Sequence, residues 1–162
     1  MQVDFVHLSS DDAHVLSRGE YLMLNAKDRI ITLLKPGRIG AQCKLSRSAF
    51  RLFFLLLRAP GGADYAEILA CLNCSEAVFS KLLAASSYER ILEILAPQIQ
   101  RWNTHLECTG SQSKVLLEKE LKIIRRAAKE RNGVNTVLLK AGFAMTVKAM
   151  YRKGYLLTHA AA

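Results

Sequence analysis

Hydrophobic and polar residues alternate along the start of the chain, and a period of two is typical of β-strands. Strands are indicated at residues 3–7, 21–25, 29–34 and 41–45. Only the polar residues AKD separate the second run from the third, so these two runs form a hairpin. Pro36 and Gly37 provide the turn before the last run. The pattern predicts an N-terminal antiparallel sheet within residues 1–45.

At Ser46 the period changes to that of a helix. Ser46 is an N-cap, and Pro60-Gly61 stops the helix that it starts. A second helix begins at Asp64, where Asp64 and Glu67 match a capping box. The apolar side chains expected in the core are Phe50, Phe53, Phe54, Leu57, Ile68, Leu69 and Leu72. Residues 46–73 therefore hold the first two helices.

Two amphipathic stretches follow, at residues 75–84 and 87–107. Pro97 is expected to break or kink the second stretch, and residues 109–113 form a polar loop. We interpret residues 74–113 as a helical insertion that packs against the rest of the domain. Its apolar residues are also a candidate contact with a second copy of the chain: Ile91, Leu92, Leu95, Ile99 and Trp102.

Residues 114–131 form a helix that is apolar on one side and basic on the other. Leu117, Leu121, Ile124 and Ala128 lie within about 60° of one another on the helix, and Leu116, Ile123 and Ala127 widen that face. The basic residues on the opposite side are Lys119, Lys122, Arg126 and Lys129. Asn132-Gly133 ends the helix, and a short apolar connector follows.

The C-terminal sequence predicts a β-hairpin at residues 145–158. MTVKAM and YLLT are the two strands, and YRKG is the turn between them. Gly154 is expected to supply a turn position that tolerates positive φ. Arg152 and Lys153 stand at the tip, so the hairpin presents two cations after the basic helix.

Positive charge is concentrated in this last part of the chain. Of the net charge of +9, the segment from Lys114 to Lys153 carries +8, with eleven basic and three acidic residues. Such a concentration is typical of a surface that binds a polyanion. The alternative is a charged surface that only keeps the protein in solution.

Four residues have the spacing of a zinc site, but their setting favours a core. Cys71 and Cys74, with His105 and Cys108, would supply three sulfurs and one nitrogen for tetrahedral zinc. Each pair lies among apolar residues, where a reduced cysteine behaves as a small hydrophobic side chain. We therefore expect free thiols at Cys71, Cys74 and Cys108, and no metal or cofactor.

No enzyme class is indicated. The histidines are scattered, and no nucleophile motif, phosphate-binding glycine loop or pair of catalytic carboxylates is recognisable. Nothing in the sequence resembles a secretory signal, and the longest apolar run, Leu52–Leu57, is far shorter than a membrane span. We expect a cytoplasmic protein with no membrane partner.

Four segments together resemble a known family. LSRSAFRLFFLLLRAPGG is similar to the first helix and following turn of the OmpR/PhoB winged-helix regulators, which include ToxR-like proteins, and DYAEILACL to their second helix. ELKIIRRAAKE is similar to their recognition helix, and TVKAMYRKGYLLT to their closing hairpin. The resemblance covers residues 21–158 and implies an α+β fold in one domain, residues 1–162. That fold is a winged helix-turn-helix with an N-terminal antiparallel sheet, three core helices, inserted helices and a C-terminal wing.

The chain departs from this family between the second and third helices, where residues 74–113 replace a short loop. In the family this loop contacts RNA polymerase, so polymerase is a candidate partner whose contact residues are not carried over. The resemblance implies a bacterial, sequence-specific transcription regulator that binds double-stranded DNA. The expected DNA-binding residues are Lys114, Lys119, Lys122, Arg125, Arg126, Lys129, Tyr151, Arg152 and Lys153.

A second hypothesis is a protein-interaction module or adaptor. Such a module would bind another regulator, or a second copy of the chain, through the inserted helices. RNA binding is a variant of the first hypothesis. It is not favoured, because the basic segment contributes only Phe143 and Tyr151 as aromatic platforms for bases.

Overall fold

The computed structural model describes residues 4–107 and 111–160 and has a mixed α+β fold. The N-terminal part is the predicted antiparallel sheet, with strand order β1-β2-β3-β4. Its strands are β1 (Phe5–Ser9), β2 (Tyr21–Asn25), β3 (Ile30–Lys35) and β4 (Arg38–Lys44). Leu22, Leu24 and Ile31 point inward and are fully buried, because alternate residues of each strand face the core.

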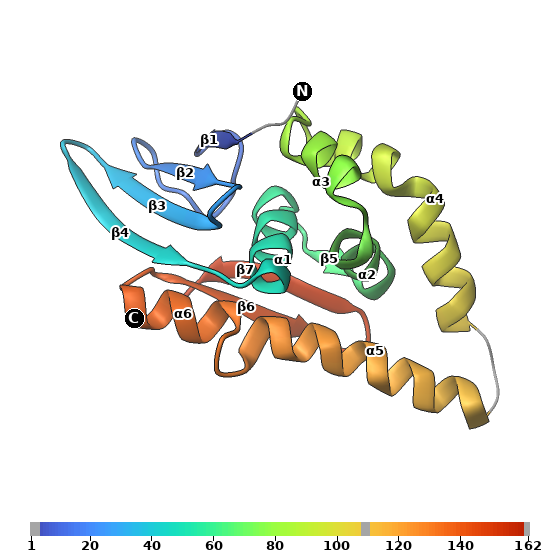
Figure 1. Ribbon diagram of the computed structural model, residues 1–162. Helices are drawn as coiled ribbons and strands as arrows, with labels where there is room; N and C mark the ends of the chain where they lie inside the picture. The colour runs from blue at the N-terminus through green and yellow to red at the C-terminus, as the bar shows by residue number, and fades with distance from the viewer. Residues whose placement is uncertain (1–3, 108–110, 161–162) are drawn as a thin grey trace.

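Helix α1 (Arg47–Arg58) lies at the centre of the molecule (Figure 1). Its predicted N-cap is confirmed, since the Ser46 side chain accepts a hydrogen bond from the amide of Ala49. Every residue from Ala49 to Arg58 is buried, including two arginines. A helix buried on all sides must be covered by several elements. Here α2, α5, α6 and β7 all contact it.

The next helices are α2 (Tyr65–Asn73), α3 (Glu76–Leu83) and α4 (Tyr88–Glu107). The capping box predicted at Asp64 and Glu67 is present, with both hydrogen bonds at 2.8 Å. The two helices predicted at residues 75–84 and 87–107 are present, α4 packs along α2, and Ile91 and Leu95 of α4 are buried. Of the two effects expected at Pro97, a break is excluded, because α4 continues through that residue.

The basic helix is α5 (Ser111–Lys129), and a further helix, α6 (Val134–Ala141), follows it. Two predictions need correction here. Ser111–Ser113 belong to α5 rather than to a loop, and the expected connector after Gly133 is helical. Gly142, with a φ of 86°, provides the left-handed residue that ends α6. The helix before the hairpin is therefore α6, which packs against β4 and β6.

The predicted C-terminal hairpin is confirmed as β6 (Met145–Met150) and β7 (Gly154–His159). A short strand that was not predicted, β5 (Ala63–Asp64), pairs with β7. The three strands form a second antiparallel sheet in the order β5-β7-β6. One continuous cluster of buried side chains joins both sheets and the helices between them.

The role expected for Gly154 is wrong in detail. The turn residue with positive φ is Arg152, at 53°, and Gly154 is not in that region. Gly154 serves a different purpose, because a Cβ at this position would overlap the carbonyl oxygen of Ala63 and lie 2.7 Å from Asp64 Cα. The glycine lets β7 approach β5 closely.

Candidate nucleic-acid interface

Helix α5 separates its buried and basic faces as the sequence predicts. Ile124, Ala127 and Ala128 are buried against the core. Four exposed side chains, which we call the basic face of α5, lie opposite: Lys119, Lys122, Arg126 and Lys129. Ile123 was expected on the apolar side, but its side chain is 38% exposed at the border between the two faces. Packing therefore leaves the cations of this face in solvent.

The tip of the hairpin carries the second group of predicted residues. Tyr151, Arg152 and Lys153 are all exposed, and the exposed fraction of Tyr151 is 85%. The guanidinium of Arg152 lies over the Tyr151 ring, 5.1 Å from its centre. The backbone of the tip is anchored, because the amide of Tyr65 donates to the carbonyl of Lys153 at 3.1 Å. The tip thus lies beside the start of α2.

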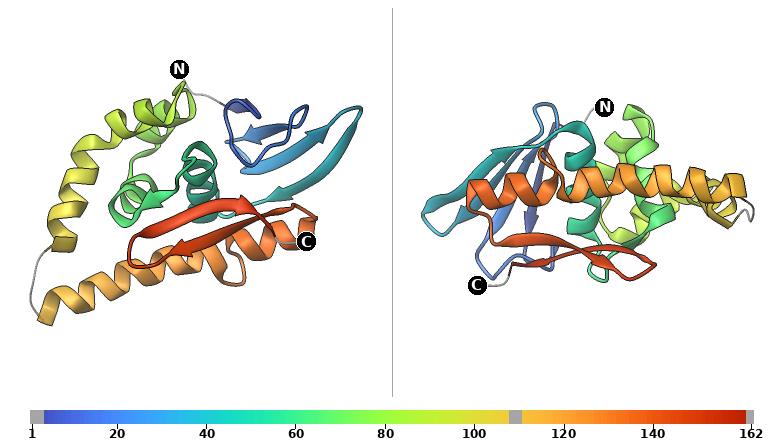
Figure 2. Two further views of the ribbon diagram at one scale, coloured as in Figure 1. Left: turned by 180° about the vertical axis from the view of Figure 1, so that it is seen from behind. Right: turned by 90° about the horizontal axis from the view of Figure 1, so that it is seen from below.

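Arg125 is exposed on α5, and its charge acts on the hydroxyl of Tyr155 on β7. Burial raises the pKa of Tyr155, and the positive charge of Arg125 opposes this shift. Seen from below, α5 crosses the middle of the molecule and the β6–β7 hairpin runs along one side of it (Figure 2, right). The basic face of α5 and the hairpin therefore belong to one surface.

Side-chain hydrogen bonds fix the hairpin from two directions. Asn135 on α6 bonds the backbone of Val147 twice, accepting from its amide at 2.6 Å and donating to its carbonyl at 2.9 Å. On the other strand, His14 Nε2 lies 2.6 Å from the carbonyl oxygen of Leu157. Because a carbonyl only accepts, Nε2 must carry the proton. Sequence reasoning missed both residues, since neither belongs to a recognisable motif.

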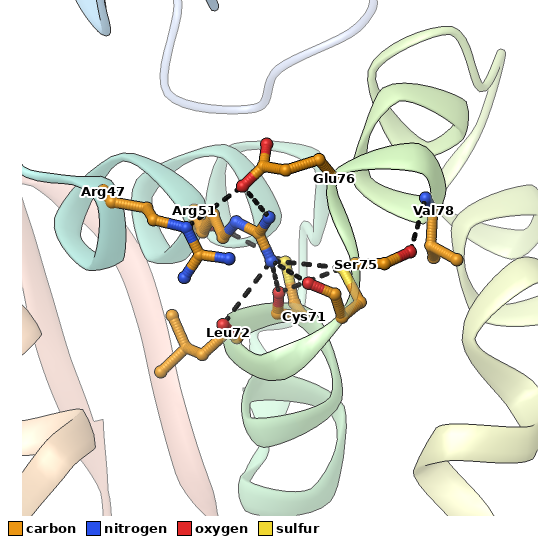
Figure 3. Close-up of polar contacts among 8 residues, drawn as sticks. Arg47, Arg51, Cys71, Leu72, Ser75, Glu76 and Val78 are labelled. Atoms are coloured by element: carbon orange, nitrogen blue, oxygen red, sulfur yellow. Dashed lines mark hydrogen bonds and ion pairs between the residues drawn. The ribbon is translucent and has the colours of Figure 1, made fainter.

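A buried arginine of α1, Arg51, joins this helix to the end of α2. Arg51 Nη1 donates to the carbonyls of Cys71 and Cys74, at 3.0 and 2.7 Å, where α2 ends (Figure 3). Its Nη2 pairs with Glu76 Oε1 at 3.0 Å, and Arg47 pairs with the same oxygen at 3.1 Å. The hydrogen bond from Arg47 and the charge of Arg51 lower the pKa of Glu76 below its usual value. The network satisfies carbonyls that the end of a helix leaves open.

The cysteine pair is part of this packing. Cys71 and Cys74 are buried, as predicted, and burial raises the pKa of both thiols. The proposed fourth zinc ligand, His105, lies edge-on to Trp102 at 5.5 Å. Cys108 falls outside the described residues. Within residues 4–107 and 111–160, no three metal-ligating side chains are grouped together.

Most of the predicted DNA-binding residues come together. The structure brings Lys119, Lys122, Arg125, Arg126 and Lys129 onto α5, beside the tip residues of the hairpin. The side chain of Lys114 is not among those described. No helix of the described ranges combines the length and the apolar content needed to cross a membrane.

Comparisons with known proteins found no matching family model, no similar curated protein and no similar solved structure.

Proposed function

We propose that this protein is a transcription regulator that binds double-stranded DNA, with α5 as its recognition helix and the β6–β7 hairpin as its wing. The observation that carries the proposal is the exposed basic face of α5 beside the hairpin tip. A helix fits the major groove of DNA, where lysine and arginine reach phosphates and base edges. Tyr151, Arg152 and Lys153 would contact the backbone on one side.

The order of elements supports a winged helix. Helices α1 and α2 are followed by a basic helix that contacts both of them, and a hairpin completes a three-stranded sheet with β5. In a winged helix, the recognition helix lies across two supporting helices in this way. Helices α3 and α4 between α2 and α5, and α6 before the hairpin, are additions to that plan.

The cations of the basic face are available to a ligand. Among the described residues, its one ion pair joins Arg126 Nε to Glu130 Oε2 at 3.8 Å, and both side chains are more than half exposed. A pair of this length in solvent is weak. Phosphates can therefore compete for these side chains, with the release of counterions from the DNA.

The inserted helices give less support to the interaction-module hypothesis. Ile91 and Leu95 of α4 are buried in the chain's own core, and Ile94, Ile99 and Trp102 pack against it. Most of the apolar residues that would bind a partner thus pack against the chain's own core. The exposed basic face has no such cover, which favours a polyanionic partner.

The test is a titration of the protein with duplex DNA over a series of salt concentrations. We expect the variant Lys122→Ala, Arg126→Ala to bind more weakly than wild type. Its slope of log affinity against log salt should flatten by about 0.9 for each phosphate that the variant no longer neutralises. Its stability should change little, because both side chains are exposed and alanine favours helices.

The control is Lys81→Ala, Arg90→Ala, which removes the same charge from the exposed surfaces of α3 and α4. If the two double variants are weakened equally, binding depends only on net charge and the basic face is not an interface. If the wild type at low salt binds no duplex, the proposed function is wrong.

A further inference from the structure

A groove of about 360 Å³ lies between the start of α1 and the end of α5. We call it the α1–α5 groove. Its main lining residues are Ser46, Ser48, Ile123, Arg126, Glu130 and Arg131. The groove is continuous with the basic face of α5, because Arg126 belongs to both.

Consecutive arginines of α5 point to its two sides. The charge of Arg125 acts on Tyr155 of the hairpin, whereas Arg126 lines the α1–α5 groove. Adjacent residues of a helix are turned by about 100°, so one helix can serve both sides. Seen from below, the start of α1 emerges on the side of α5 away from the hairpin (Figure 2, right). Basic groups thus flank α5 on each side.

The charges of the groove favour an anion. Arg131 is exposed and makes no ion pair within the described ranges, and the pair between Arg126 and Glu130 is long. The first turn of α1 carries no acidic side chain, so the positive end of the helix dipole is not neutralised there. Ser46 and Ser48 add two hydroxyl groups at the same place. Glu130 is the one carboxylate in the lining.

We propose that the α1–α5 groove binds a backbone phosphate of the DNA strand opposite the one that the hairpin contacts, with Arg126 and Arg131 as its cations. This inference rests on the proposed function and adds a second backbone anchor to it. The major groove is about 12 Å wide and a helix is about 10–12 Å across, so a helix seated there lies close to both strands. The hairpin reaches one strand, and the start of α1 reaches the other.

Two variants test the anchor. Arg131→Gln removes the unpaired cation, and Ser48→Asp places a carboxylate in the groove. Aspartate in the first turn of a helix is stabilising, so Ser48→Asp should leave the protein as stable as wild type or more stable. Weaker DNA binding by this variant cannot then come from unfolding. Thermal unfolding followed by circular dichroism checks this point.

Binding is measured with a random-sequence duplex of about 20 base pairs, two turns of DNA, over a salt series. Arg131→Gln should flatten the salt slope by about 0.9, as expected for one phosphate contact. Combined with Lys153→Gln at the hairpin tip, it should flatten the slope by about twice that amount. If the slope change of the double variant equals the sum of the changes of the two single variants, Arg131 and Lys153 contact the DNA backbone separately.

Each variant has a matched control. Arg90→Gln removes an exposed arginine from α4, and Ala77→Asp adds a carboxylate at the equivalent position in the first turn of α3. Both controls should keep the wild-type slope. If the wild type binds DNA but Arg131→Gln and Ser48→Asp behave like their controls, the groove is not an anchor and the proposed function stands. If the wild type binds no duplex, both proposals fail.

Discussion

Two arginines, Arg51 and Arg58, interrupt the apolar sequence of α1, and both side chains are buried. Arg58 donates to the carbonyls of Asp12 and Ala85, which lie in different segments. Arg51 donates to carbonyls at the end of α2, and its guanidinium lies 4.5 Å from the centre of the Phe79 ring. A buried charge is tolerated only when it is paired and hydrogen-bonded. These arginines therefore connect segments that apolar contacts alone would not fix.

Arg51 and Arg47 share the partner Glu76 but differ in burial, and this allows a direct comparison. Replacing Arg51 with Met should lower the free energy of unfolding by about 3–5 kcal/mol, because it leaves buried carbonyls without donors. Arg47→Met should cost at most about 1 kcal/mol, since the Arg47 side chain is 53% exposed. Urea unfolding followed by circular dichroism measures both values. If both variants lose the same free energy of unfolding, the burial of Arg51 does not determine its contribution to stability.

At the scale of elements, the close approach of β7 to β5 depends on Gly154. A Cβ there would meet the backbone of Ala63 and Asp64, which no side-chain rotation can relieve. We expect Gly154→Ala to lower the free energy of unfolding by about 1–3 kcal/mol through this overlap. It should also weaken protection of the Tyr155 amide from hydrogen exchange.

Gly61→Ala is the control for this prediction. No atom lies within 4 Å of a Cβ built on Gly61, which also has no positive φ. Its stability should stay near that of wild type. A Gly154→Ala variant as stable as Gly61→Ala would show that the two strands can separate without cost.

The elements that the sequence predicts well have strong local signals. Ser46 and the pair Asp64 and Glu67 are caps with defined hydrogen bonds, and the structure contains all of them. Helix α6 was missed although Gly142 marks its end, because eight residues are too few to show a clear helical period. Strand β5 has only two residues and exists through its pairing with β7. No local pattern can reveal a strand of that kind.

The candidate site was predictable in part for the same reason. The basic face of α5 follows from a helical period over many residues, and the hairpin follows from two alternating runs. The α1–α5 groove brings Ser48 next to Arg131, which is far from it in the chain. Such a contact depends on how the helices pack. Periodicity fixes which side of a helix is buried, but not which helix covers it.

At the scale of the whole molecule, one cluster of buried residues extends from the N-terminal sheet to β7. A single core predicts that the protein unfolds in one cooperative transition. Trp102, the one tryptophan in the sequence, lies on α4 and packs against this core. Its fluorescence should therefore change at the same urea concentration as the circular dichroism of the whole chain. A transition of Trp102 at lower urea would show that α4 unfolds separately.

Strand β7 is the central strand of the second sheet, and its partner β5 precedes it by more than half the chain. Synthesis on a ribosome proceeds from the N-terminus, so α1 and β5 leave the ribosome well before β7 does. Until then, the side of α1 that β7 covers stays in contact with water, and β5 has no partner. Exposed apolar surface and unpaired strands favour aggregation. The nascent chain is therefore expected to need protection by chaperones until β7 is inserted.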